Sequence, residues 1–129
     1  MRKPRIIAVD DDIDILKVIK SALQNESEIL LLSDSTEVIP NLEKFKPDLL
    51  IIDIMMPTLS GYEICEIIRN NTDYYDMPIA FMTSFTDEGS RRDVFKIGGS
   101  YLIEKPFEIE KIKRVVHLLL ELWKPKERD

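Results

Sequence analysis

The feature that most constrains the fold is an alternation of short apolar runs with longer stretches of helical period. Five runs rich in β-branched and aliphatic residues recur along the chain: Ile6–Asp10, Glu28–Leu32, Leu49–Asp53, Ile79–Thr83 and Tyr101–Glu104. Three of them are almost wholly apolar, as strands covered on both faces of a sheet are. The alternation therefore predicts β/α units arranged around a parallel sheet.

Helical periodicity marks four of the intervening stretches: Ile13 to Leu23, Tyr62 to Arg69 after Ser60-Gly61, Asp87 to Ile97 before Gly98-Gly99, and Phe107 to Lys124. The remaining crossover, Ser35 to Lys46, is less regular. Because Pro40 lacks an amide donor, we expect a short or kinked helix there. Five such units favour an α/β fold of the flavodoxin-like type, a doubly wound five-stranded parallel sheet in the order 2-1-3-4-5 with five helices.

Size and composition fit one domain. The chain has 129 residues, and 44% of them are hydrophobic, which is enough for one continuous core. We place the domain at residues 1–124 and interpret the charged residues 125–129 as a tail or the start of a linker. Two readings stay open at this point: a stand-alone domain, or a piece of a longer protein.

The charge balance narrows the class of partner. There are 24 acidic and 18 basic residues, for a net charge of -6, which argues against direct binding to nucleic acid or to an anionic membrane. The first apolar run is too short for a signal peptide or a membrane span. Cys65 is the single cysteine, which excludes an internal disulfide and fits a cytoplasmic location.

Acidic residues gather where the predicted topology brings strand ends together. Asp10 and Asp11 lie at the carboxyl end of the first predicted strand and Asp53 lies at the carboxyl end of the third, and these two strands are neighbours in the order 2-1-3-4-5. Two carboxylates about 4 Å apart repel by roughly 4 kcal/mol at an effective dielectric constant of about 20. A bound cation offsets that repulsion, and carboxylate oxygens favour Mg²⁺, or Mn²⁺ in its place. Asp12 and Asp14 better fit the first turn of the helix that follows.

Two further polar groups reach the same edge of the sheet. The fourth strand ends at Thr83, and the fifth is followed by Lys105-Pro106. The edge thus combines acids, a hydroxyl group and an ammonium group.

At this point the sequence resembles the receiver domain of two-component response regulators, of the chemotaxis-receiver type. The resemblance covers Ile6 to about Leu120. Its motifs are the acidic cluster VDDD, the DxxMPxxxG segment from Asp53 to Gly61, the strand end MTS and the segment EKPF. Asp11, Asp53, Thr83 and Lys105 follow one another at intervals of 42, 30 and 22 residues. In this order and at these intervals, the motifs are highly specific.

The resemblance implies a role for each matching residue. Asp53 is the phosphoacceptor that takes a phosphoryl group from a sensor histidine kinase or a phosphotransfer protein. Asp10, Asp11, Asp53 and the backbone carbonyl of Met55 bind Mg²⁺, while Thr83 and Lys105 contact the phosphoryl oxygens. It also implies a cis Lys105–Pro106 peptide bond. The domain is then no enzyme with an independent substrate, since it catalyses only its own phosphorylation and dephosphorylation.

The sequence departs from the family pattern at the switch position. Three residues before Lys105 the family usually has Tyr or Phe, but this chain has Leu102, and its aromatic Tyr101 falls one place earlier. A shift of one residue along a strand points a side chain to the opposite face. Leu102 is therefore either a smaller switch coupled to Thr83, in place of the aromatic side chain, or no switch.

The last helix is more apolar than one core face requires. Ile109, Ile112, Val116 and Leu119 form one stripe, and Val115, Leu118, Leu122 and Trp123 extend it. Such an excess often marks a partner surface. We therefore expect a homodimer or a docked partner on the face formed by the fourth helix, the fifth strand and the fifth helix, the alternative being a broad core stripe.

Two other functions share parts of this pattern. Asp10-Asp11-Asp12 spells the DxD of a haloacid-dehalogenase-type phosphatase, with Asp10 as nucleophile and Asp12 as acid, but the chain is short for that family and Asp53 would have no role. Binding of FMN would need a loop rich in hydroxyl groups and glycine after the first strand. The acids found there would repel the FMN phosphate.

Overall fold

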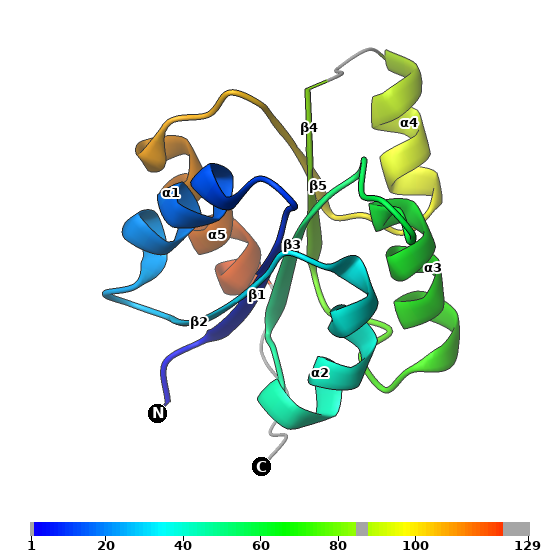
Figure 1. The fold of residues 1–129 in the computed structure, drawn as a ribbon, viewed down its shortest axis with the longest axis horizontal. Helices are drawn as coiled ribbons and strands as arrows, with labels where there is room; N and C mark the ends of the chain where they lie inside the picture. The colour runs from blue at the N-terminus through cyan, green and yellow to red at the C-terminus, as the bar shows by residue number, and fades with distance from the viewer. Residues whose placement is uncertain (1, 85–87, 123–129) are drawn as a thin grey trace.

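The computed structural model describes residues 2–84 and 88–122, except the side chains of residues 88–91 and 122 (Figure 1). Several expectations lie outside the described residues: the helix start at Asp87, the helix end at residues 123–124 including Trp123, and the tail or linker at residues 125–129. The side chain of Leu122 is likewise not described.

Five parallel strands form one sheet in the order β2-β1-β3-β4-β5. Their bounds are β1 Arg5–Val9, β2 Glu28–Leu32, β3 Leu49–Asp53, β4 Ile79–Thr83 and β5 Tyr101–Glu104. The predicted fold class and strand order are confirmed. The first strand lies one residue earlier than predicted, so Asp10 follows β1 rather than ending it.

Helices connect the strands in the described part of the chain. Their bounds are α1 Ile13–Leu23, a 3₁₀ turn Ser35–Glu37, α2 Val38–Phe45, α3 Gly61–Asn71, α4 Glu88–Lys96 and α5 Ile109–Leu122. The helix of the second crossover, α2, is short, as predicted, and Pro40 lies in its first turn, where no intrahelical amide donor is needed. The fifth helix begins two residues later than the predicted Phe107.

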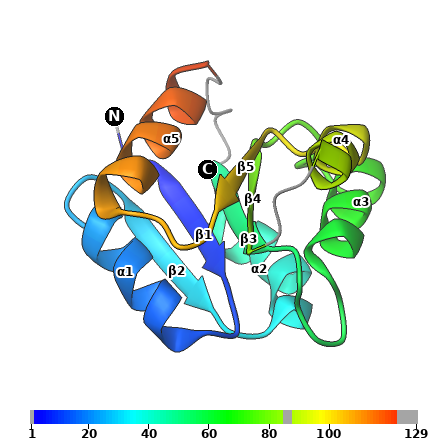
Figure 2. The same ribbon diagram turned by 90° about the horizontal axis from the view of Figure 1, so that it is seen from above.

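The sheet is covered on both faces, and Figures 1 and 2 show α1 and α5 on one side and α2, α3 and α4 on the other. Each face has its own apolar core. Every residue of β3 and β4 is buried, as is β1 after Arg5, which confirms the prediction from their apolar runs. None of the helices in the described residues has the length and hydropathy of a membrane span.

Helix starts follow their local sequence. Asp12 caps α1, where its Oδ1 accepts a hydrogen bond from the amide of Asp14 at 2.9 Å, and Asp14 lies in the first turn, as predicted for these two acids. Ser60 caps α3 in a reciprocal capping box with Glu63. The helical period that predicted α1 begins with Ile13, but this side chain is 51% exposed because it occupies the first helical position.

The apolar surface of α5 divides differently from the prediction. Among the described side chains of α5, the buried apolar ones are Ile112, Val115, Val116 and Leu119. Ile109 and Leu118 are exposed. The core stripe therefore includes Val115, which was assigned to the extension, and excludes Ile109, which was assigned to the stripe.

Candidate functional site

Three carboxylates meet at the carboxyl edge of the sheet. Because β1 pairs with β3, Asp10 and Asp53 emerge from adjacent strands. One oxygen from each of Asp10, Asp11 and Asp53 lies within 4.8 Å of the others. Asp10 is fully buried and Asp53 nearly so, whereas Asp11 is exposed. The structure thus brings together the acids that the strand order placed side by side, two of them buried and one exposed.

Lys105 lies between the two buried acids. Its Nζ is 2.7 Å from Asp10 Oδ2 and 3.1 Å from Asp53 Oδ2. Its own amide donates a hydrogen bond to the carbonyl of Thr83 at 2.8 Å, which holds the start of the β5–α5 connection against the end of β4. The Lys105–Pro106 peptide bond is cis, as the resemblance implied. One ammonium group therefore serves two carboxylates.

The local environment shifts the charge equilibria of this cluster. Burial raises the pKa of Asp10, and the negative charge of Asp53 adds to the effect, against the opposing contact with the Lys105 ammonium group and the hydrogen bond from the Asp12 amide. Burial alone would lower the pKa of Lys105, but its contacts with Asp10 and Asp53 outweigh burial and raise the pKa. The lysine is thus held in its charged form, while the negative charge of Asp10 is disfavoured.

The backbone around Asp53 is tightly fixed. Asp53 Oδ1 accepts a hydrogen bond from the amide of Met55 at 3.2 Å, and the amide of Ile54 bonds to the carbonyl of Met82 at 3.0 Å. The start of α3 packs directly on this backbone, since a Cβ atom at Gly61 would lie 2.6 Å from the carbonyl oxygen of Asp53. A glycine is therefore required at Gly61. The side chain of Met55 is 65% exposed, which leaves its backbone as the part that belongs to the site.

The hydroxyl-bearing residue predicted for this edge is also present. Thr83 is the last residue of β4 and is 2% exposed. Its strand lies between β3 and β5, so it stands between the strands that end at Asp53 and precede Lys105.

The donor set suits a divalent cation. Three carboxylates supply hard oxygen ligands, which Mg²⁺ prefers. Asp10 Oδ2 is buried and makes no hydrogen bond of good geometry, although Lys105 Nζ lies close to it. An oxygen in that state has capacity for a further electrostatic partner. The residues present therefore fit Mg²⁺ or a similar ion.

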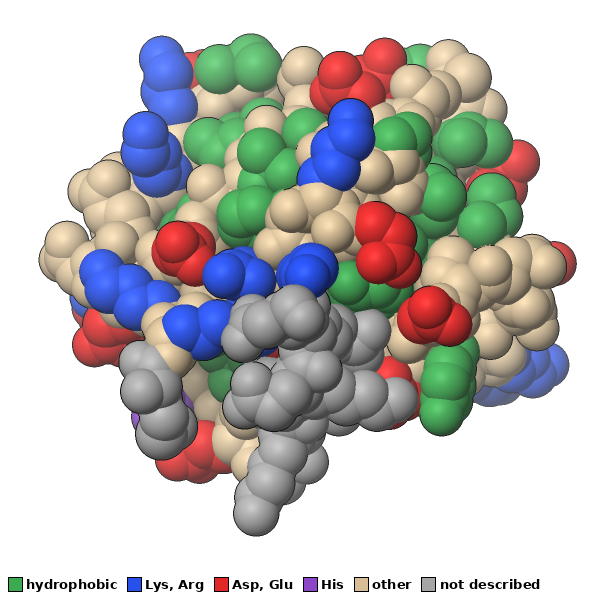
Figure 3. All heavy atoms as spheres, turned by 90° about the horizontal axis from the view of Figure 1, so that it is seen from below, with side chains coloured by type: hydrophobic (Ala, Val, Ile, Leu, Met, Phe, Trp, Pro, Cys, Tyr) green, Lys and Arg blue, Asp and Glu red, His purple; other side chains and the backbone are tan. Residues whose placement is uncertain are grey.

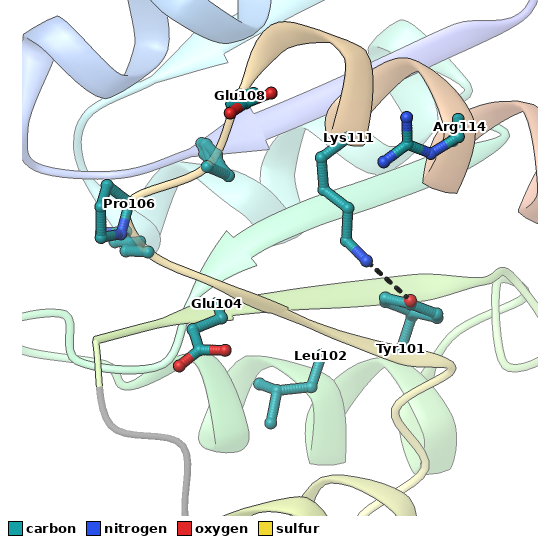
Figure 4. A pocket seen from close by; sticks show the side chains of 9 residues that line it. Tyr101, Leu102, Glu104, Pro106, Glu108, Lys111 and Arg114 are labelled. Carbon is teal, nitrogen blue, oxygen red and sulfur yellow. Dashed lines mark hydrogen bonds between the residues drawn. The ribbon is translucent and has the colours of Figure 1, made fainter.

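Two residues of β5 point to opposite sides of the sheet, as Figure 4 shows for the labelled Tyr101 and Leu102. Leu102 pairs with Phe81 of β4 and packs against the core beneath α2, α3 and α4. Tyr101 packs against the core beneath α1 and α5, where its hydroxyl accepts a hydrogen bond from Lys111 Nζ at 3.3 Å. The predicted consequence of the one-residue offset is confirmed: the aromatic side chain lies on the other face.

One polar residue at this edge was missed by the sequence reasoning. Ser35, after β2, is fully buried and donates a hydrogen bond from its Oγ to the carbonyl of Leu59 at 2.6 Å. A single serine after a strand has no periodicity or motif spacing that would have distinguished it from an ordinary loop residue.

Comparison with known proteins places this site in a family. The family model for the response regulator receiver domain matches residues 6–117. The transcriptional regulatory protein YvrH of Bacillus subtilis is 34% identical over 98% of this chain and 54% of its own length. The response regulator MprA of Mycobacterium leprae is 32% identical over 94% of this chain and 53% of its own length. The chain thus spans about half the length of the curated relatives it matches.

Solved structures agree with the observed fold. The chemotaxis protein CheY4 of Vibrio cholerae superposes with a TM-score of 0.87 at 26% identity, covering 92% of this chain and 100% of that chain. A BeF3-activated receiver domain of DrrB gives a TM-score of 0.83 at 28% identity, covering 93% and 99%. With its strand order, its acidic edge and the match over residues 6–117, the chain belongs to the receiver domains of two-component response regulators.

Proposed function

We propose that this domain takes a phosphoryl group onto Asp53 from a sensor histidine kinase or a phosphotransfer protein, the partners with which receiver domains interact. The observation that carries the proposal is the position of Asp53, nearly buried beside Asp10 and in contact with Lys105. A carboxylate so enclosed is poised to act as a nucleophile beside groups that neutralise charge.

The residues divide the work of this transfer. A carboxylate oxygen of Asp53 forms the new bond to phosphorus while the bond from phosphorus to the donor breaks, and the electron pair of that bond leaves with the donor. Lys105 and the hydroxyl of Thr83 then contact the phosphoryl oxygens. Since such a transfer needs little covalent help, position and charge compensation supply most of the catalysis.

Asp10, Asp11, Asp53 and the backbone carbonyl of Met55 would hold Mg²⁺, or Mn²⁺ in its place. When bound, the ion supplies positive charge to the phosphoryl oxygens and offsets the repulsion among the acids. Lys105 occupies the space between Asp10 and Asp53 in the structure, at 2.7 and 3.1 Å. We infer that it turns from these carboxylates to the phosphoryl group when Asp53 is modified.

The output surface in this proposal is the face of α4, β5 and α5. A hollow of about 540 Å³ lies there between β5 and α5, next to Lys105, and Figure 4 shows Glu104, Lys111 and Arg114 around it. A phosphoryl group on Asp53 attracts the hydroxyl of Thr83. In this proposal the side chain of Leu102, in place of an aromatic side chain, fills the space that Thr83 leaves. A homodimer through this face follows as the proposed signalling state.

The proposed boundaries are a receiver domain at residues 1–124 followed by a tail or linker. Relatives of about twice the length fit a chain that continues into an output domain. The domain turns over no independent substrate in this proposal, since it catalyses only the gain and loss of its own phosphoryl group.

The dehalogenase-type alternative is not favoured by the geometry. It needs Asp12 as an acid beside Asp10, but the carboxylate of Asp12 caps α1 through the amide of Asp14. It also leaves Asp53 and Lys105 without a function, although both lie beside Asp10.

The test is incubation with acetyl phosphate and Mg²⁺, followed by mass spectrometry of the intact protein and of its peptides. Wild type should gain one phosphoryl group on Asp53, Asp53→Asn should gain none, and Asp10→Asn should be slowed severely. An exposed acid gives the matched control: Asp14→Asn should gain the group as wild type does. A phosphoryl group located on Asp10 would contradict the proposal and favour the phosphatase.

A further inference from the structure

The loop between β3 and α3 contains a strained turn. Thr58 has a φ of 72°, in the left-handed region that β-branched residues rarely adopt. The amide of Leu59 donates a hydrogen bond to the carbonyl of Pro57 at 2.9 Å, which closes a three-residue ring around Thr58. This is a γ-turn with positive φ, the rare and strained kind. Such a conformation persists only where the surroundings hold it.

The group that reaches the middle of this turn comes from another loop. Ser35, in the 3₁₀ turn after β2, is fully buried, and its Oγ lies 2.6 Å from the carbonyl oxygen of Leu59 and 3.4 Å from that of Pro57. A hydroxyl group has one proton to donate, and the shorter contact identifies Leu59 as its acceptor. The hydroxyl is therefore hydrogen-bonded to the turn at Leu59 and lies close to the Pro57 carbonyl on the other side of Thr58.

The same loop carries the backbone next to the phosphoacceptor. Its first residues are tied to Asp53 by the amide of Met55 at 3.2 Å, and its end is tied back by the amide of Gly61, which bonds to the carbonyl of Ile54 at 3.0 Å. Between these two ties the chain passes through the turn at Thr58. A relaxation of the turn therefore has to be taken up by the peptide units on either side, including those of Met55.

We propose that Ser35 is a positioning residue for the phosphorylation site, because its hydroxyl holds the strained turn at Thr58 and thereby fixes the Met55 segment beside Asp53. This rests on the proposed function, since the Met55 carbonyl is assigned there to Mg²⁺. The role belongs to a residue with no motif of its own. It acts through the loop and touches neither the ion nor the phosphoryl group.

The experiment compares Ser35→Ala with Ser33→Ala, which removes the same group from an exposed position on the same loop. Two quantities are measured: the hydrogen-exchange protection of the Leu59 amide without Mg²⁺, and the Mg²⁺ dissociation constant by calorimetry. Ser35→Ala should reduce the exchange protection of the Leu59 amide. It should also raise the Mg²⁺ dissociation constant by about tenfold, the low end of the range for groups that orient metal ligands. Ser33→Ala should leave both unchanged.

Relief of the strain provides the decisive arm. Glycine adopts a positive φ freely, so Thr58→Gly makes the turn independent of its clamp. Adding Thr58→Gly to Ser35→Ala should restore both quantities to those of Thr58→Gly alone. A folded Ser35→Ala protein with wild-type protection and affinity overturns the proposal, as does a loss that Thr58→Gly does not relieve.

The remaining outcomes are also decisive. If Ser35→Ala does not fold, the double variant takes its place, and its folding with the Mg²⁺ affinity of Thr58→Gly supports the clamp, while its failure overturns it. If wild type binds no Mg²⁺, the proposed function fails, and the Leu59 exchange still decides whether Ser35 holds the turn.

Discussion

Two fully buried aspartates stand at opposite edges of the sheet, and the structure treats them differently. Asp48, just before β3, accepts hydrogen bonds from both terminal nitrogens of Arg2 at 2.7 and 3.0 Å and from the amide of Arg5 at 2.9 Å. Asp10, just after β1, accepts one from the amide of Asp12 at 2.9 Å and shares Lys105 with Asp53.

The difference separates a structural carboxylate from a binding one. At the amino edge, which Figure 3 shows with both basic and acidic side chains on its surface, Asp48 pairs with both terminal nitrogens of Arg2. At the carboxyl edge Asp10 shares the ammonium group of Lys105 with a second acid, Asp53. The pKa of Asp10 is raised by burial and by the negative charge of Asp53. At equal burial, Arg2 compensates the charge of Asp48, whereas the charge of Asp10 is only partly compensated by Lys105, and a bound cation would offset the remainder.

The largest effect should come from breaking the structural aspartate. Asp48→Asn removes the charge that Arg2 pairs with and turns an amide group toward donors. We expect the free energy of unfolding to fall by about 3 kcal/mol, the low end for a broken buried pair, because Arg2 is partly exposed. Denaturant titration in EDTA measures it. A loss below about 1 kcal/mol would show that Asp48 is not a buried structural partner.

The corresponding change at the other edge should have the opposite sign. Asp10→Asn keeps the shape of the side chain but removes a buried charge that faces Asp53. We expect the protein in EDTA to become more stable by about 1–2 kcal/mol. The same titration applies, and destabilisation by this variant would mean that the pair with Lys105 outweighs the repulsion.

The pH dependence sharpens this second prediction. Because the pKa of folded Asp10 lies above its ordinary value of 3.8, the folded state binds more protons than the unfolded state between these two values. The contribution of Asp10 to the free energy of unfolding of the Mg²⁺-free protein therefore falls as the pH rises through that window. The advantage of Asp10→Asn over wild type should be small at acidic pH and full at neutral pH. An advantage independent of pH would contradict the assignment to the charge.

An exposed ion pair at the amino edge should give the smallest effect. Arg5 Nε lies 3.1 Å from Glu28 Oε2, but the Glu28 side chain is 53% exposed. Glu28→Gln should change the free energy of unfolding by about 0.5 kcal/mol or less. It serves as the control for Asp48→Asn, since both variants remove the acidic partner of an arginine at the same edge. Equal losses in the free energy of unfolding would show that burial of Asp48 is not the cause of its larger expected effect.

The fold was largely predictable because its signals are local. Apolar runs and helical periods fixed the five strands, and the strand order followed from the length of the units. Boundaries differed by one or two residues, as at Arg5 and Ile109, since strand ends depend on pairing and helix starts on the groups that cap them. The assignments of Ile109 and Val115 in α5 and of Ile13 in α1 were wrong because helical periodicity does not give the width of the helix face that packs against the sheet.

The candidate site was predictable where it depends on strand ends. Asp10, Asp53, Thr83 and Lys105 each follow or end a strand, so topology alone gathers them at one edge. Contacts between two loops left no such signal. The bond from Ser35 to the loop at Leu59, and the positive φ of Thr58, depend on how separate segments meet in space.

The pairing of Asp48 with Arg2 was missed for the same reason. Its partners lie 46 residues apart in the sequence, and neither belongs to a motif. Charge patterning along the chain cannot show which acid a distant arginine reaches.

The most direct test of the contrast is the dependence of the free energy of unfolding on Mg²⁺ concentration in wild type, Asp10→Asn and Asp48→Asn. An ion that binds only the folded state adds stability as RT ln(1 + [Mg²⁺]/Kd), about 2.7 kcal/mol at a hundredfold excess over Kd. Wild type and Asp48→Asn should gain stability equally, from different starting values, while Asp10→Asn should gain little. A wild type indifferent to Mg²⁺, or an Asp10→Asn variant that gains as much, would contradict the division between the two aspartates.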